Sequence, residues 1–178
     1  MRIASKRQQA MRILVIIYEF PPVGGGGGHA AREICRDLAQ RGHEVHVLTA
    51  HYKGLSRLED QEGIQIVRVP SARQTPYQAG LLPMSGFVLA GLFAGLRHLA
   101  QWKPDLFHVH FAVPSGPVAW ALSRYSGIPY VLTAHLGDVP IGVPEKTDRG
   151  VRWVFPFTPS IWRRAAQVVA GSEHTRQL

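Results

Sequence analysis

The sequence predicts an α/β protein with a doubly wound, mostly parallel Rossmann-like sheet of about six strands and helices on both faces. Two observations predict this fold class. Short apolar, strand-like runs alternate along the chain with helix-like segments, which is the order that builds a parallel sheet. The first run is followed by a glycine-rich turn and a helix, as in a βαβ unit. The length of 178 residues suits one domain with a substantial core.

The first predicted unit is a strand, a glycine turn, a helix and a second strand. Residues 12–18 (RILVIIY) form a continuous apolar run rich in β-branched residues, as expected of a central strand buried on both faces. After five glycines, residues 29–42 carry apolar side chains at helical spacing, and Gly42 gives a stop signal. Residues 44–50 are the next strand, so the crossover between the two strands should be right-handed.

The alternation continues to the end of the chain. Residues 64–69 alternate between apolar and polar side chains, as in a strand nearer a sheet edge. The remaining predicted elements, in order, are an apolar helix at 84–101, a strand at 105–111, a helix at 117–126, a strand at 128–135 and a last strand within 165–172.

Two segments could be a secretory signal or a membrane-spanning helix. The first ten residues carry three basic side chains but no apolar stretch, so they are not a secretory signal and are expected to be a flexible basic leader to a domain at 11–178. Residues 78–96 carry no formal charge and approach the length of a membrane span, but Pro83 and several glycines interrupt them. A buried helix of a soluble protein is the preferred interpretation, and no spanning segment is predicted.

The composition narrows the classes of function. Cys35 is the single cysteine, which excludes an internal disulfide framework and a zinc site built from cysteines. Twenty Lys and Arg against twelve Asp and Glu give a formal net charge of +8, which suggests an anionic partner. The basic residues are spread along the chain with no helix-turn-helix or RNA-recognition signature, so no nucleic acid partner is expected.

A run of glycines lies where the first strand ends, at the edge of a parallel sheet where ligands bind. Gly24–Gly28 allow close approach of the backbone and open a helix whose first N–H groups suit a phosphate, although a flexible hinge without a ligand is the alternative. The run departs from the dinucleotide fingerprint, because His29 or Ala30 stands at its last position, and it lacks the Walker lysine. Hydride-transfer enzymes and nucleoside triphosphatases are therefore disfavoured.

Histidines follow two later strands. His108 and His110 share one face of the fourth strand, and His110, at the carboxyl end, is the better candidate for a pocket. A metal would need a third ligand that the neighbouring sequence does not supply, so no metal site is predicted. His135 and Asp138 follow the fifth strand, where they could hydrogen-bond sugar hydroxyls or transfer protons, and a purely structural turn is the alternative for Asp138.

The order of these pieces resembles the amino-terminal half of a GT-B glycosyltransferase, most similar to the retaining family 4. The resemblance covers about residues 11–178, and its most specific parts are RGHEVHVLT and the closing VVAGSEHTRQL. It rests on five stretches in the right order: RILVIIYEFPPVGGGGGHAARE, LAQRGHEVHVLTA, KPDLFHVHF, GIPYVLTAHLGD and AAQVVAGSEHTRQL.

The resemblance implies that the glycine turn lies against the donor diphosphate and the acceptor. The family's Gly-Gly pair matches Gly25-Gly26 by spacing. The turn residues expected to make these contacts are Gly24, Gly25, Gly26 and Gly27.

It also implies roles for the residues after the later strands. His135 matches the histidine of the family's His-Gly-x-Asp element and would be the catalytic residue that binds the transferred sugar in the transition state. Asp138 takes the position of the acid, while Leu136 stands where the family usually has glycine. His110 matches the acceptor-side position, so His110 and Asp138 are expected to bind the acceptor or the sugar.

The implied reaction transfers a sugar from a nucleotide-sugar donor to an acceptor with retention of configuration. The nucleotide sugar is a substrate, no cofactor is expected, and helix-end N–H groups with basic residues would stabilise the leaving phosphate without an essential metal. The family's second Rossmann domain is expected after Leu178, and the 178-residue chain alone is expected to be inactive. A non-catalytic Rossmann-like binding module for an anionic ligand or partner is the alternative.

Residues 149–164 interleave arginine with tryptophan and phenylalanine, a pattern that favours anionic membrane interfaces. With the apolar helix, this predicts a cytoplasmic protein in peripheral contact with an anionic membrane, acting on a lipid-linked or glycan acceptor. Packing of these aromatic side chains in the core or against another domain is the alternative.

Overall fold

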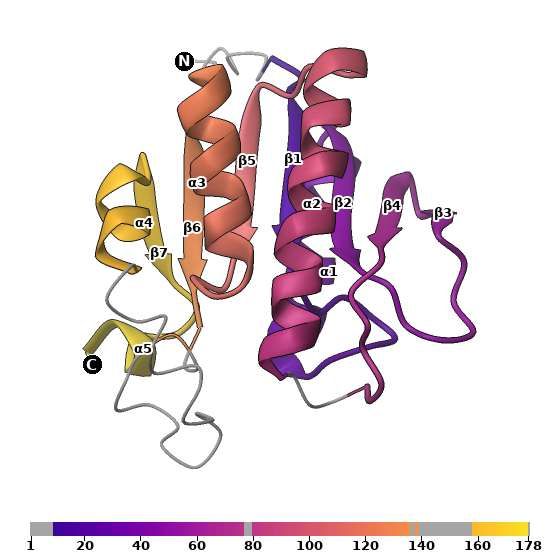
Figure 1. Cartoon of the computed structure of the whole chain (residues 1–178). Coiled ribbons are helices and arrows are strands. Elements are labelled where there is room, and N and C mark those ends of the chain that lie inside the picture. Colours follow the sequence, from indigo (N-terminus) through magenta and orange to yellow (C-terminus); the bar gives the residue numbers. More distant parts are fainter. Residues whose placement is uncertain (1–8, 77–79, 136–137, 139–157, 178) are drawn as a thin grey trace, which may run out of the picture.

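The structure, a computed structural model, is a seven-stranded sheet covered by helices on both faces (Figure 1). It describes residues 9–76, 80–135, 138 and 158–177. The strands are β1 (Arg12–Ile17), β2 (Glu44–Ala50), β3 (Leu58–Gln61), β4 (Ile64–Val69), β5 (Leu106–His110), β6 (Tyr130–Ala134) and β7 (Gln167–Ala170). The helices are α1 (Gly26–Gln40), α2 (Leu81–Gln101), α3 (Ser115–Ser126), α4 (Thr158–Arg164) and α5 (Glu173–Gln177).

The strand order is β3-β4-β2-β1-β5-β6-β7, and β3 is antiparallel to β4 while all other neighbours are parallel. The predicted fold class is confirmed. From β1 the chain builds outward through β2 and β4 and then returns to place β5 on the other side of β1. Such a reversal of strand order is where ligands bind in open α/β sheets. The register places the carboxyl ends of β1, β5 and β6 side by side, with Ile17 beside His110 and His110 beside Thr133.

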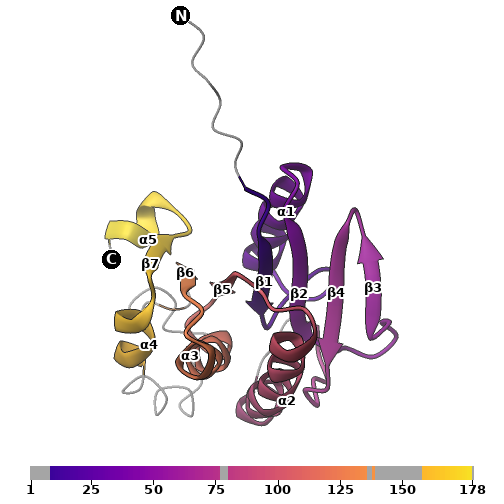
Figure 2. The same ribbon diagram turned by 90° about the horizontal axis from the view of Figure 1, so that it is seen from above.

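The core has two parts, one on each face of the sheet (Figure 2). On one face, Ala31 and Cys35 of α1 pack against β1 residues such as Val15. On the other face, α2, α3 and α4 cover the alternate β1 residues, among them Ile16. Both faces of the central strand are therefore buried, as its continuous apolar sequence predicts.

The described elements differ from the predicted ones at one sheet edge and in one helix. The segment before residue 64 contains a polar edge strand, β3, which raises the strand number from about six to seven. Glu62 and Gly63, both with positive φ (55° and 78°), form the two-residue turn of a β3–β4 hairpin. Residues 158–164, for which the sequence predicts no helix or strand, form the short helix α4.

Helix α2 is half-buried, whereas the sequence predicts a buried helix. Phe87, Gly91 and Gly95 face inward, and the small glycines let Val118 and Leu122 of α3 pack against the α2 backbone. The outer face carries exposed leucine and phenylalanine side chains. By length and composition alone, α2 is the one described helix that could cross a membrane. The absence of a spanning segment stays a prediction.

Candidate functional site

The glycine turn connects the carboxyl end of β1 to the start of α1, as predicted. Gly24 has φ +99° and its N–H donates to the Pro76 carbonyl, so the turn is tied to the loop after β4. Gly25 is the N-cap of α1, and the first N–H groups of an α-helix have no partner within the helix. A methyl group on Gly25 or Gly26 would meet no atom within 4 Å. The backbone here is therefore open to a ligand.

The glycine turn and the loop after β6 meet at Gly27. A methyl group on Gly27 would lie 2.5 Å from Phe111 Cζ and 3.2 Å from His135 Nδ1. The Phe111 ring stacks on the His135 imidazole with 4.2 Å between centroids. Phe111 reaches this position with φ +69°, a conformation that non-glycine residues seldom adopt and that is common at functional sites. Residues distant in sequence thus form one corner of the sheet rim.

The His135 ring is also contacted from β5. His135 Nε2 lies 3.2 Å from His110 Nδ1, while His108 Nε2 lies 2.9 Å from Thr133 Oγ1. Burial, helped by the neighbouring imidazoles, lowers the pKa of His108 to about 4 and that of His110 well below its usual value. Burial also lowers the pKa of His135. The three rings are therefore neutral at pH 7, and each offers one donor and one acceptor.

His110 is fully buried behind His135 rather than facing solvent. Its Nε2 atom has no hydrogen-bond partner among the described residues. Direct contact of His110 with an acceptor stays a prediction, and the structure shows the contact that His110 makes with the His135 ring.

Asp138 holds the two loops of the corner together. Its carboxylate accepts hydrogen bonds from the backbone N–H of His135 (2.9 Å) and of Ala112 (2.7 Å). Burial raises the pKa of Asp138 to about 6, although these backbone bonds lower it. Asp138 therefore fixes the position of the His135 backbone. Whether it also binds sugar stays a prediction, and the neighbouring Leu136 and Gly137 lie outside the described residues.

Two charged residues that the sequence analysis does not single out support the glycine turn. Glu19, just after β1, accepts a hydrogen bond from the Gly25 N–H at 3.4 Å. The buried guanidinium of Arg73 pairs with Glu19 at 3.0 Å and lies over the Tyr18 ring. This cation offsets a carboxylate that would otherwise repel an anion at the turn. In the sequence, only the position of Glu19 directly after the first predicted strand indicates that it could belong to the site.

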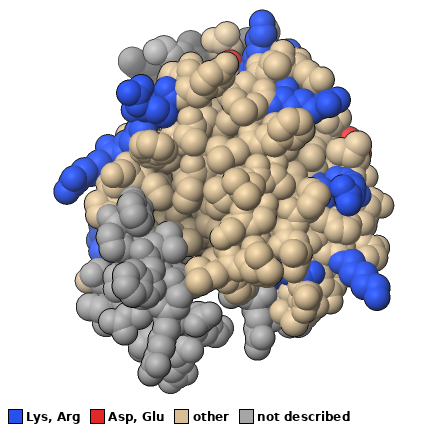
Figure 3. Space-filling model, viewed as in Figure 1, with Lys and Arg blue, Asp and Glu red and all other residues tan. Residues whose placement is uncertain are grey.

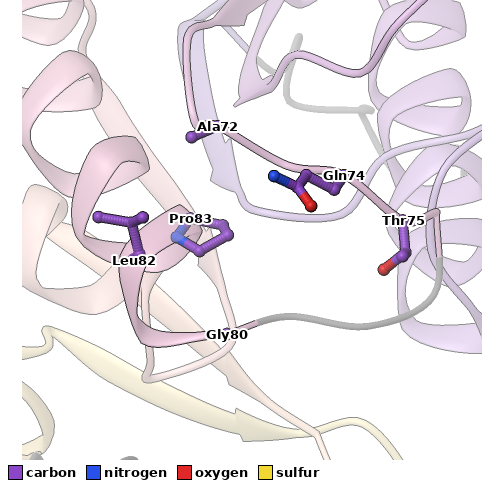
Figure 4. A pocket seen from close by; sticks show the side chains of 6 residues that line it. All are labelled: Ala72, Gln74, Thr75, Gly80, Leu82 and Pro83. Carbon is purple, nitrogen blue, oxygen red and sulfur yellow. The ribbon is translucent and has the colours of Figure 1, made fainter.

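A hollow of about 340 Å³ lies between the loop after β4 and the start of α2 (Figure 4). Its lining mixes polar and apolar side chains, as a site for a polar organic molecule would. The lining residues are Ala72, Gln74, Thr75, Gly80, Leu82 and Pro83.

The remaining predicted features are only partly within the described residues. Residues 149–157 of the basic aromatic segment lie outside them, while Trp162, Arg163 and Arg164 belong to α4 or its end. Within the described part of the chain, no group of three or more His, Cys, Asp or Glu is placed to hold a metal ion. The predictions about metals and cofactors stay predictions.

The corner combines features that suit a sugar with an anionic leaving group. The turn offers backbone N–H groups and the positive end of the α1 dipole, which stabilise negative charge. The neutral His135 imidazole contacts His110 and Phe111, while Asp138 fixes the His135 backbone, and the ring can hydrogen-bond an adjacent hydroxyl.

The chain is similar in sequence to known proteins. The family described as Glycosyltransferase Family 4 matches residues 24–178. The 2-deoxystreptamine N-acetyl-D-glucosaminyltransferase of Streptomyces fradiae is 36% identical over 126 residues, covering 66% of this chain and 29% of that protein. The 2-deoxystreptamine glucosyltransferase of Streptomyces kanamyceticus is 30% identical over 151 residues, covering 79% of this chain and 38% of that protein.

Glycogen synthase of Mycobacterium tuberculosis is 33% identical over 141 residues, covering 70% of this chain and 33% of that protein. Sucrose-phosphate synthase from Thermosynechococcus elongatus superimposes with a TM-score of 0.63 at 16% identity, covering 91% of this chain and 47% of that one, which supports the fold. The chain spans about a third of the length of the curated relatives it matches.

Proposed function

The chain belongs to glycosyltransferase family 4, and on this premise we propose that it forms the acceptor-side half of an enzyme that transfers a sugar from a nucleotide sugar to an acceptor with retention of configuration. The observation that carries the proposal is the contact of Gly27 with His135. It joins a turn suited to a diphosphate to a side chain suited to a sugar.

In this proposal the two parts of the corner have different tasks. Departure of the nucleoside diphosphate leaves an oxocarbenium-like sugar and places negative charge on the leaving phosphate. The N–H groups in the first turn of α1, which begins at Gly26, stabilise that charge. His135 binds a hydroxyl of the sugar as a neutral group, because its lowered pKa keeps the imidazole uncharged at pH 7. No cofactor and no essential metal are part of this proposal.

The substrates are proposed at the level of chemical class. The names of the Streptomyces relatives describe transfer of glucose or N-acetylglucosamine, which supports a nucleotide-activated hexose or hexosamine as the donor. The hollow between the loop after β4 and the start of α2 would receive a polar acceptor. A lipid-linked or glycan acceptor, at the cytoplasmic side of an anionic membrane, is the finer form of the proposal.

Replacing His135 with alanine in the catalytically competent protein tests the proposed function. We expect kcat to fall by about 10²–10³, the usual effect of losing one transition-state hydrogen bond, with little change in the melting temperature. Release of nucleoside diphosphate in the presence of acceptor is the measurement. His98→Ala, at the far end of α2, is the control and should keep near-normal activity.

Two outcomes would contradict the proposal. Unchanged kcat in the His135→Ala protein would remove His135 from the reaction. Binding of nucleoside diphosphate and acceptor without any transfer by the intact protein would instead favour the non-catalytic binding module.

A further inference from the structure

The helical layer formed by α2, α3 and α4 has an unusual charge distribution. None of the twelve acidic residues of the chain falls within these three helices. By contrast, α1 on the other face of the sheet carries both signs, and Arg36 and Arg41 each pair with an acidic side chain of their own helix. Among the described residues, the layer of α2, α3 and α4 is therefore basic or neutral, whereas α1 carries both signs.

The outer surface of α2 carries a stripe of apolar side chains that the sheet does not cover. Leu82, Leu89 and Phe93 are 76%, 71% and 74% exposed, and Leu96 continues the stripe one turn later at 42%. Their spacing of seven, four and three residues places them along one side of the helix. Exposed apolar groups that line up in this way are typical of an interaction surface, whereas scattered ones are not.

Cations and aromatic side chains border this stripe. Arg97 follows it on α2, and Arg124 and Tyr125 lie exposed at the end of α3. Among the described residues, no acidic side chain pairs with Arg97 or Arg124. Figure 3 looks onto this side and shows a broad uncharged centre, basic groups around the margin, and acidic atoms only at the edges.

We infer that this surface, the α2–α3 face, docks the protein on an anionic lipid bilayer. Leu82, Leu89, Phe93 and Leu96 would enter the interfacial region, and the arginines at its margin would contact lipid phosphates. The arginines at the margin are complementary in charge to anionic lipid headgroups, which favours a bilayer as the partner. Two copies meeting through the same face would bring arginine toward arginine with no acid between them, which disfavours a dimer. The inference deepens the proposed function, whose finer form places the acceptor at an anionic membrane, and the two fail separately because vesicle binding is measured without glycosyl transfer.

Sedimentation with lipid vesicles tests the inference. We expect the protein to bind phosphatidylcholine–phosphatidylglycerol vesicles at least tenfold more tightly than phosphatidylcholine vesicles, and to lose this preference in high salt. The Leu89→Gln/Phe93→Gln protein should bind the mixed vesicles at least tenfold more weakly, because two exposed apolar anchors are removed. Leu58→Gln is the matched control, since Leu58 is 73% exposed on the edge strand β3.

A second pair of variants measures how much the positive charges at the margin contribute to vesicle binding. Arg97→Gln/Arg124→Gln should weaken binding to mixed vesicles by about tenfold or more, since each cation near an anionic surface contributes on the order of 1 kcal/mol. Arg36→Gln/Arg41→Gln removes the same charge from α1 on the opposite side and should leave binding within about threefold. Circular dichroism of each variant establishes that the fold is intact.

Several results would overturn the inference. Equal binding to neutral and anionic vesicles, or equal losses in test and control variants, would show that the α2–α3 face is not an anionic-lipid surface. A lipid-free dimer that dissociates in the Leu89→Gln/Phe93→Gln protein would assign the face to a second copy. Protection of α2 from hydrogen exchange without lipid, in a longer polypeptide carrying this domain, would assign it to another part of the chain.

Discussion

At the scale of single residues, the packing around Gly27 leaves no room for a side chain. Gly27 lies against the Phe111 and His135 rings, whereas Gly26, one position earlier, faces open space. The two neighbouring glycines therefore serve different purposes. Gly27 allows the first helix to approach the His135 corner, and Gly26 keeps the approach to the helix N-terminus clear for a ligand.

Alanine at each position separates these purposes. Gly27→Ala should lower the free energy of unfolding by about 1–3 kcal/mol, because the new methyl group displaces a stacked ring pair. Gly26→Ala should leave it within about 0.5 kcal/mol or raise it slightly, since alanine favours a helix more than glycine does. It should nevertheless weaken diphosphate binding. Denaturant unfolding measures both stabilities, and equal losses would show that the described packing at Gly27 is wrong.

Which residues of the site could be predicted depended on their distance along the chain. His135, Asp138 and the glycine turn each follow a strand, so the rule that parallel strands end at one rim was enough to bring them together. The supporting residues were not predictable. Glu19 and Arg73 are 54 positions apart and meet only through loop conformation. The stacking of Phe111 on His135 depends on a positive φ angle that the sequence does not indicate.

At the scale of elements, the edge strand β3 could not be predicted from the pattern of apolar and polar residues. Its sequence, LEDQ, is polar and largely exposed, so it carries no strand signal of its own. The turn after it did carry one, because glycine in Glu62-Gly63 just before an apolar strand is typical of a two-residue hairpin. The buried strands β1, β2, β5 and β6 were predictable from their mainly apolar, β-branched sequences between turn and helix signals.

The hairpin turn offers a stabilising change. Glu62 has φ +55°, which asparagine adopts more readily than glutamate does, so Glu62→Asn should raise the free energy of unfolding by about 0.5–1 kcal/mol. The substitution also removes the exposed Arg32–Glu62 ion pair, which contributes little to stability. Asp60→Asn removes the same charge from extended backbone of the same hairpin and is the control. A destabilised Glu62→Asn protein would contradict the assigned turn.

At the scale of the whole molecule, the neutral histidines under the rim make stability depend on pH. The lowered pKa values of His108, His110 and His135 mean that the unfolded chain binds protons first as the pH falls below about 6.5. Their contribution is present above that pH and is lost toward pH 4. Asp138 acts in the opposite direction, because its raised pKa lets the folded state bind a proton between about 6 and 4.

Burial also lowers the pKa of His46 on β2 to about 4, and these four histidines outweigh one carboxyl group, so the protein should be less stable at pH 5 than at pH 7 by roughly 2 kcal/mol or more. Urea unfolding at the two pH values is the measurement. His108→Asn should reduce the difference, since it removes one of the four imidazoles. Equal or greater stability at pH 5 in the unaltered protein would mean that these rings are not buried as described.

The central claim is that the glycine turn and the His135 corner form one side of a cleft for a sugar and a diphosphate. An NMR titration of ¹⁵N-labelled protein with a nucleoside diphosphate tests it most directly. Shifts should concentrate at the amides of Gly25, Gly26 and His135, while Gly42 and Gly127 at the opposite rim should stay unchanged. Shifts spread equally over both rims, or absent from the glycine turn, would contradict it.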